Sequence, residues 1–303
     1  MPTILPRPAA CAHAFAAVAM MGAGLPLHAG EQAPPEPVRI VPAGKWNIDY
    51  GVSDCLMQRV FEADGKRYLV SISQSAPGRT FGLKLAGPEI SRTLGAKALS
   101  LALSDSGPAV VEGSVMSAKM PEFGPTLIFT GVSLEPRPPA DAPPVPRSAG
   151  IDPATAATAN RIALDLGKGK PGIRFETGAL KSVFAALNTC TDDLLTQWGL
   201  DPAQHRAYVA PVFRNAMAVV TQLQKTYPRD AAVNRESGVF SFRLIIEADG
   251  TISDCQIEAL TKVNDLDPRC REVIRIAKFD PARDAAGQPM RSFYATTVTY
   301  MTP

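Results

Sequence analysis

Residues 238–260, with the sequence GVFSFRLIIEADGTISDCQIEAL, restrict the fold of this chain more than any other stretch. Apolar side chains alternate through its first half, at Phe240, Phe242, Leu244 and Ile246, which is the two-residue period of a β-strand. The segment EADGT then separates this run from a second one, and Asp-Gly between two such runs indicates a tight β-turn. We therefore predict an antiparallel hairpin here.

The flanking segments extend this hairpin into a small α+β unit. Pro228 begins a short helix candidate before the hairpin, and Asp267-Pro268 begin a second helix after it. The apolar face of the second helix holds Cys270, Val273, Ile274 and Ala277. The sequence DPARDAAGQP, from Asp280, cannot continue this helix, and residues 291–301 return as a last strand. We expect a three-stranded antiparallel sheet with two helices.

The chain before this unit is predicted to be rich in β-strands. Short runs alternate between apolar and polar residues and are separated by Gly, Pro, Ser or Asp; they are WNIDY, CLMQRVFEADGKRYLVSIS, FGLKLAG, AKALSLALS, TLIFTGV, RIALDLG and GIRFETG. A meander or a sandwich-like antiparallel sheet fits this pattern. A long amphipathic helix is expected at 179–198, with Cys190 in its apolar stripe and Gly199 as its C-terminal cap. The predicted fold class is therefore α+β.

Two Pro-rich stretches divide the chain, because such sequences favour extended spacers. The predicted organisation is a signal peptide at 1–29, a Pro-rich linker at 30–44, a β-rich domain at 45–214 with a Pro-rich insertion at 135–150, and a small C-terminal domain at 215–303.

The first residues have the composition of an export signal. Arg7 is followed by an apolar run from Ala9 to Leu27, and Leu27-His28-Ala29 is a small-residue cleavage site. A signal peptide cut near Ala29 would place the protein in the periplasm. The alternative is an uncleaved anchor in the inner membrane, since the run is close to the shortest length that spans a bilayer.

Four cysteines remain after the signal: Cys55, Cys190, Cys255 and Cys270. An even number in an exported protein indicates disulfides, and four cysteines allow three connectivities. We infer that Cys55 pairs with Cys190, which would hold the long helix against the first strands. Cys255 would then pair with Cys270 inside the C-terminal unit.

Composition argues against several other function classes. The chain has 31 Lys and Arg against 29 Asp and Glu, so it has no strong positive field for nucleic acid. His205 would be the one histidine of the exported part, and no CxxC pair accompanies it, so we predict no metal site and no cofactor. We also predict no enzyme, because no nucleophile and base can be assembled around His205.

The order of the C-terminal motifs resembles the C-terminal domain of TonB and of TonB-like energy transducers. The motifs are Tyr227-Pro228 opening a helix, Gly238 leading into a strand that ends in EADGTI, LDPRC opening the second helix, and FDPARDAAGQPM before a final strand. The resemblance covers roughly the last 80 to 90 residues. It implies a periplasmic, non-enzymatic domain that binds other proteins.

In this family the domain pairs a short segment of an outer-membrane transporter with its exposed edge strand. The resemblance therefore implies a TonB-dependent transporter as partner and residues 291–301 as the edge strand. The residues expected to bind the partner are Arg291, Phe293, Ala295, Thr297, Thr299, Tyr227 and Pro228.

Energy transduction for transmembrane transport would also need an inner-membrane complex such as ExbB/ExbD, which implies an uncleaved N-terminus. The chain departs from a full TonB because a folded region stands where the family has a long Pro-rich rod. A second hypothesis is therefore an exported β-rich protein that binds a ligand or an envelope component and uses the TonB-like unit only as a docking module.

Overall fold

The computed structural model describes residues 35–300, except 95, 97, 106, 137–138, 140–145, 168, 226 and 266–269. The predicted signal peptide at 1–29 lies outside the described residues. Among the residues described, no helix is both long enough and apolar enough to cross a membrane.

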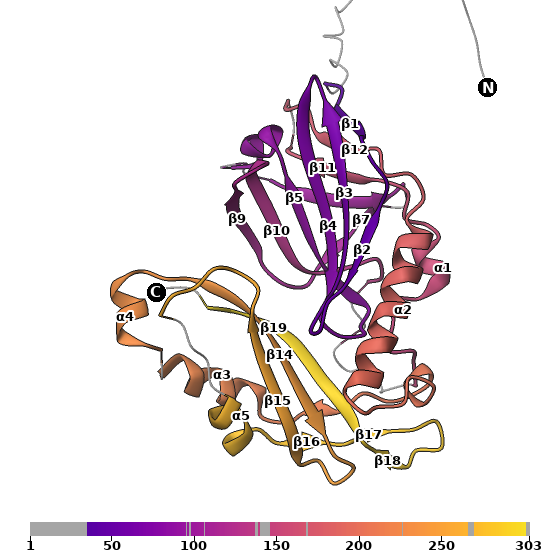
Figure 1. Cartoon of the computed structure of the whole chain (residues 1–303), viewed down its shortest axis with the longest axis vertical. Helices are drawn as coiled ribbons and strands as arrows, with labels where there is room; N and C mark the ends of the chain where they lie inside the picture. The colour runs from indigo at the N-terminus through magenta and orange to yellow at the C-terminus, as the bar shows by residue number, and fades with distance from the viewer. Residues whose placement is uncertain are drawn as a thin grey trace, which may run out of the picture. The chain divides into compact units, whose positions relative to one another are not determined.

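The N-terminal region is built on a 12-stranded sheet (Figure 1). Its strand order is β7-β6-β11-β12-β1-β3-β4-β5-β10-β8, with β2 beside β3 and β9 beside β10. Neighbouring strands are antiparallel, except β1 and β12, which are parallel. The strands are β1 Val38–Pro42, β2 Asn47–Tyr50, β3 Cys55–Ala63, β4 Lys66–Gln74, β5 Thr80–Ala86, β6 Ser100–Ser104, β7 Gly107–Pro108, β8 Val110–Val111, β9 Val115–Met120, β10 Gly124–Ser133, β11 Ile162–Asp165 and β12 Ile173–Phe175.

Two parts of this sheet differ from the sequence-based expectation. β1 lies within the segment expected to be a Pro-rich linker. This segment forms a strand because Ile40 is fully buried and the strand pairs with both β3 and β12. β9 was not foreseen as a strand. Most of its side chains are exposed, so it carries no apolar alternation, and it is held by its ladder to β10.

Helix α2, Lys181–Gln197, packs along one side of this sheet (Figure 1). Val183, Phe184 and Leu187 of α2 are buried, and the Phe184 ring lies 5.0 Å from the Phe81 ring of β5. Gly199 ends the helix with a φ of 69°, a conformation that suits glycine. Short helical turns flank this region at η1 Pro88–Thr93, α1 Pro153–Ala156 and η2 Gln204–Arg206.

The C-terminal part has a three-stranded antiparallel sheet in the order β15-β14-β19. The predicted hairpin is present as β14 Gly238–Ile246 and β15 Ile252–Ala259, and the last strand is β19 Ser292–Tyr300. Its helices are α3 Ala216–Lys225, α4 Arg229–Val233 and α5 Cys270–Ile276. Short strand pairs β13 Val212–Phe213 with β16 Phe279–Asp280, and β17 Ala282–Arg283 with β18 Pro289–Met290, complete it.

The helices of this part differ in detail from the prediction. α3 was not foreseen, since its ten residues fall between the two stretches that carried clear helix signals. The face of α5 was also partly misassigned, because Val273 is 2% exposed whereas Ile274 is 43% exposed. The start predicted for α5, at Asp267-Pro268, lies outside the described residues.

Both inferred disulfides are present. Cys55 of β3 is bonded to Cys190 of α2, and Cys255 of β15 is bonded to Cys270 of α5. Each bond joins a strand to the helix that covers its sheet. The first closes 135 residues of chain and is buried, with its cysteines at most 1% exposed; the second closes 15 residues and is only partly buried.

Removing the two disulfides should therefore have unequal effects. In the chain-entropy model, loss of the long loop costs about 5 kcal/mol of unfolding free energy and loss of the short loop about 3 kcal/mol. We expect the double variant Cys55→Ala/Cys190→Ala to be less stable than Cys255→Ala/Cys270→Ala, as measured by urea denaturation without reductant. Equal stability of the two variants would contradict this order.

Candidate functional site

Strand β14 is the centre of the C-terminal sheet. It pairs with β15 from Phe240 to Ile246 and with β19 along its whole length. Phe240, Phe242 and Leu244 face a cluster that includes Val219 of α3 and Val273 of α5. Both edges of β14 are thus occupied, and the free edges of this sheet within the described residues belong to β15 and β19.

The two outer strands differ in how open they are to a further strand. β15 carries Asp254 and Glu258 and is tied to α5 by its disulfide. Charged residues on an edge strand discourage pairing with other chains. β19 has no charged residue between Ser292 and Tyr300. Its edge is therefore the better site for strand addition.

The direction of the backbone groups of β19 follows from the hydrogen bonds of β14. The Leu260 N–H donates to the Val239 carbonyl at 2.7 Å, and the Val239 N–H donates to Thr261 Oγ1 at 3.0 Å, so Val239 bonds on the β15 side. In an antiparallel ladder, pairs that exchange hydrogen bonds alternate with pairs that do not. Thr299, which pairs with Val239, therefore directs its N–H and C=O away from β14.

The same alternation applies along the rest of β19. The residues whose N–H and C=O groups point outward are Phe293, Ala295, Thr297 and Thr299. No further backbone partner of these four residues is found within the part of the chain that the structure describes. They are the four residues of β19 that the sequence comparison with the TonB family singled out.

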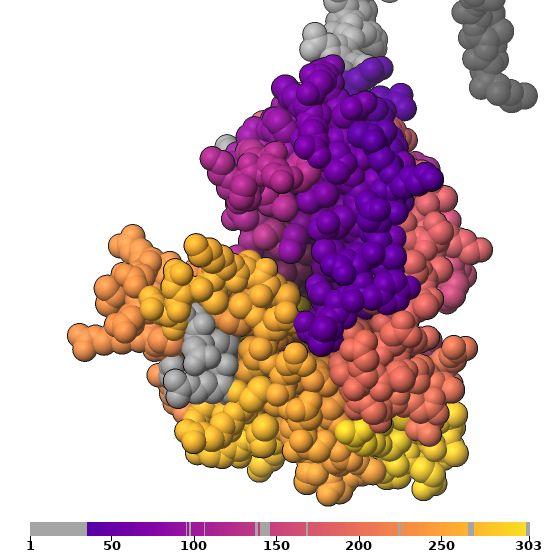
Figure 2. All heavy atoms as spheres, viewed as in Figure 1, coloured from indigo at the N-terminus to yellow at the C-terminus, as the bar shows by residue number. Residues whose placement is uncertain are grey.

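The first half of β19 is fixed to the segment that follows α2. Phe293 is 5% exposed and its ring lies 5.8 Å from the Trp198 ring. Arg291 donates to the Gly199 carbonyl at 2.8 Å and to Glu247 at 2.9 Å. In Figure 2 the yellow atoms of the segment before β19 lie against the salmon atoms of the segment after α2.

We call the apolar group at this contact the junction cluster; its buried members are Ala149, Leu195, Leu200, Tyr208, Ile245, Ala282, Met290 and Phe293. Arg243 of β14 also contributes, with its guanidinium 4.7 Å from the centre of the Trp198 ring. The side chains of Arg291 and Phe293 therefore contact other residues of this chain. The predicted contact of these two residues with a partner thus concerns their backbone groups.

The remaining predicted residues lie toward the other end of the strand. Ala295 and Thr299 are partly buried and Thr297 is exposed. Tyr227 is near this end, since its ring lies 6.1 Å from that of Tyr300 and its hydroxyl donates to the Glu236 carbonyl. Pro228 precedes α4 as its N-terminal cap residue. The structure thus brings Tyr227 close to the end of β19.

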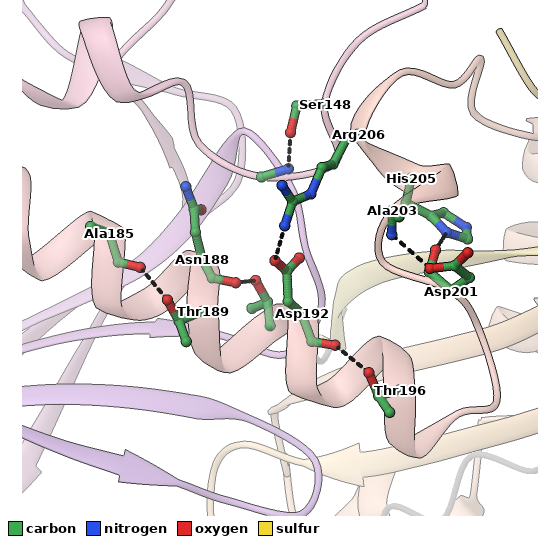
Figure 3. Close-up of polar contacts among 12 residues, drawn as sticks. Ser148, Ala185, Asn188, Thr189, Asp192, Thr196, Asp201, Ala203, His205 and Arg206 are labelled. Carbon is green, nitrogen blue, oxygen red and sulfur yellow. Dashed lines mark hydrogen bonds and ion pairs between the residues drawn. The ribbon is translucent and has the colours of Figure 1, made fainter.

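His205 lies in the short helical turn η2, and Figure 3 shows its ring beside Asp201. Its imidazole is 1% exposed, with Nδ1 2.8 Å from the Asp201 carbonyl and Nε2 3.0 Å from Ser292 Oγ. Because a carbonyl only accepts, Nδ1 carries a hydrogen, and in the neutral ring Nε2 then accepts from the Ser292 hydroxyl. The imidazole therefore connects η2 to the first residue of β19.

Burial lowers the pKa of His205 below its usual value. The hydrogen bond to the Asp201 carbonyl and the charges of Asp201 and Asp192 act in the opposite direction and are smaller effects. The buried histidine is consequently unprotonated at neutral pH. Protonation would put a charge inside the junction cluster and remove the acceptor of the Ser292 hydroxyl.

A cavity of about 380 Å³ adjoins β19, and several of the residues that line it were not predicted from the sequence as site residues. From β19 it is lined by Ala295, Thr296 and Thr297. The N-terminal region contributes residues of β4, β5 and β10 and of the loop after β4, among them Gln74 and Lys84. Gln74 is a single polar residue at the end of a strand, so no periodicity or motif could have identified it.

The junction histidine generates a pH-dependent prediction. The unfolded chain titrates near pH 6.5 at this residue and the folded chain at a lower pH, so the unfolded state binds more protons in between. The wild-type free energy of unfolding should fall as the pH decreases from about 7.5 to 5.5. In His205→Gln that fall should be smaller. Urea denaturation at both pH values measures the difference, and identical pH dependence in the two proteins would refute the assignment.

Comparison with known proteins concerns the C-terminal part of the chain. Residues 223–302 match the family model described as Gram-negative bacterial TonB protein C-terminal. A comparison with curated proteins finds no match. The matched residues contain β14, β15, β19, α4 and α5, and the 12-stranded sheet lies outside them. Residues 223–302 of this chain are thus similar in sequence to the TonB C-terminal domain.

Proposed function

We propose that this protein binds outer-membrane transporters in the periplasm by adding a segment of the transporter as a fourth strand beside β19. The observation that carries the proposal is the row of outward N–H and C=O groups on Phe293, Ala295, Thr297 and Thr299. Strand addition satisfies such groups and gives affinity through backbone hydrogen bonds. The TonB C-terminal family match supports a role in envelope transport.

The sequence of β19 fits this way of binding. Its central residues, Ala295, Thr296 and Thr297, are small and uncharged, so a second backbone can approach closely. Each added hydrogen bond contributes about 0.5–1.5 kcal/mol net, and several are needed for a stable complex. The residues next to β19 would then determine which side chains of the partner fit.

Thr297→Pro tests the backbone directly. Proline removes an N–H that points away from β14, so the ladder within the sheet loses no bond, and proline is tolerated on edge strands for this reason. The variant should bind a peptide from the N-terminal segment of a TonB-dependent transporter about tenfold more weakly, which is the loss of roughly one hydrogen bond. Isothermal titration calorimetry measures this change.

Two neighbouring substitutions serve as controls. Thr297→Val changes the same side chain but keeps the N–H, so binding should stay within about twofold of wild type. Thr296→Pro removes a hydrogen bond to β14 and should instead lower the melting temperature. Unchanged peptide affinity in a folded Thr297→Pro variant would count against strand addition at β19.

Coupling to an ExbB/ExbD-like complex depends on the N-terminal segment. A cleaved signal peptide would separate the folded protein from the inner membrane, whereas an uncleaved segment would anchor it there facing the periplasm. We expect the exported protein to begin near Gly30, because Leu27-His28-Ala29 is a small-residue cleavage site. N-terminal sequencing decides, and a first residue before Ala9 would favour the anchored form and energy transduction.

A further inference from the structure

Helices α3 and α5 cover one face of the C-terminal sheet. Phe242 and Leu244 of β14 point toward the cluster that contains Val219 of α3 and Val273 of α5. Side chains alternate between the two faces of a strand, so Ile245 points the other way and joins the junction cluster. The outer side of α3 and α5 therefore faces away from the junction with the N-terminal region.

The two helices form one continuous surface, because the residues before α3 are bonded to the end of α5 (Figure 1). The Asn215 amide donates to the Ile276 carbonyl at 2.8 Å, and its oxygen accepts from the Lys278 N–H at 2.8 Å. The Arg214 N–H donates to the Lys278 carbonyl at 2.9 Å. These bonds hold α3 beside α5.

Large apolar side chains are exposed on both helices. Met217 and Val220 of α3 are 76% and 38% exposed, and Ile274 of α5 is 43% exposed. Their inward neighbours, Val219 and Val273, already supply the contacts that the core needs. Exposed apolar side chains grouped in this way are typical of a surface that binds a membrane or another protein.

The charges around these apolar residues are mostly positive. Residues 214–225 and 270–278 contain five Lys or Arg residues and one acidic residue, Glu272. Glu272 is paired with Arg275, and Arg214 is paired with Asp280. The other three cations are exposed and have no ion-pair partner among the described residues; they are Lys225, Arg271 and Lys278. The surface thus combines exposed apolar groups with an excess of positive charge.

An anionic phospholipid surface is complementary to this combination. Apolar side chains enter the boundary between headgroups and acyl chains, while Lys and Arg contact the phosphates, and binding strength depends on both. A stable protein complex buries roughly 800 Å² on each partner, far more than three side chains provide. The core of a protein interface is also depleted in charged residues. The observations therefore favour lipid over a protein partner.

We propose that the outer side of α3 and α5 is a membrane-docking surface, which binds bilayers that contain anionic phospholipid and inserts Met217, Val220 and Ile274 among the headgroups. This inference goes beyond strand addition and does not depend on it. The backbone groups of β19 point outward in the plane of the sheet, whereas the helices cover its face. Docking through the helices thus leaves the edge of β19 open to a transporter segment.

Vesicle co-sedimentation of the full chain tests the docking surface. We expect binding to vesicles of equal parts phosphatidylglycerol and phosphatidylcholine to be at least about tenfold tighter than binding to phosphatidylcholine alone. Added salt should weaken the binding, because it screens exposed charges.

Two variants separate the apolar and the electrostatic contributions. Met217→Ser/Val220→Ser removes apolar groups and should weaken binding to the anionic vesicles about tenfold. Lys225→Gln/Lys278→Gln removes two charges and should weaken it about twentyfold. Melting temperatures check that each variant is folded. If the double serine variant unfolds, Met217→Ser alone replaces it, since this is the most exposed of the apolar positions.

The matched control is Val115→Ser/Lys119→Gln. It removes one exposed apolar group and one exposed cation from β9, which belongs to the 12-stranded sheet. Vesicle binding of the control should equal that of the wild type. Both helix variants should also keep the wild-type affinity for the transporter peptide, so a failure of strand addition at β19 would be seen separately.

Three results would overturn the proposal. The first is equal binding, or none, to the two kinds of vesicle. The second is a loss of binding in the charge variant but not in a folded serine variant, because the apolar residues would then not be inserted. The third is a dimer, detected by analytical ultracentrifugation, that Met217→Ser/Val220→Ser abolishes, because the surface would then join two copies of this chain. Weaker vesicle binding in both variants, with an unchanged control, supports membrane docking.

Discussion

The double pairing of strand β14 is the constraint on which the rest of the C-terminal structure depends. β14 is buried along almost its whole length and has a hydrogen-bonded neighbour on each side. Its alternation fixes which side chains face the helices and also which backbone groups of β19 point outward. A shift of register by one residue would exchange both sets. The same ladder thus determines the core and the binding edge.

The junction cluster divides β19 into two halves with different roles. At the start of the strand, Phe293, Ser292 and Arg291 are held by contacts to the segment after α2. Farther along, Ala295 and Thr297 line a cavity. A strand with one end fixed loses less conformational freedom when a second strand is added, so the contacts at Phe293 favour binding at the residues that follow.

Much of the fold could be predicted because its signals are local. The alternation of Phe240, Phe242 and Leu244 and the EADGT turn located β14 and β15, and helical spacing located α2. The two disulfides were also correctly inferred. β9 and α3 were not predicted from the sequence, because β9 has mostly exposed side chains and α3 lies outside the stretches with clear helix signals. Nothing local in the sequence indicated the surroundings of His205, because they depend on burial against Phe293 and a hydrogen bond to Ser292, which lie far away in the chain.

The sequence by itself determined the TonB-like unit, its last strand and the absence of charge along that strand, because these depend on residues close together in the chain. Only the tertiary structure decided which backbone groups of β19 point outward, since that follows from its register with β14. The cavity wall opposite β19 also could not be predicted from the sequence. Gln74 and Thr297 are more than two hundred residues apart, and only packing of the two regions brings them to one cavity.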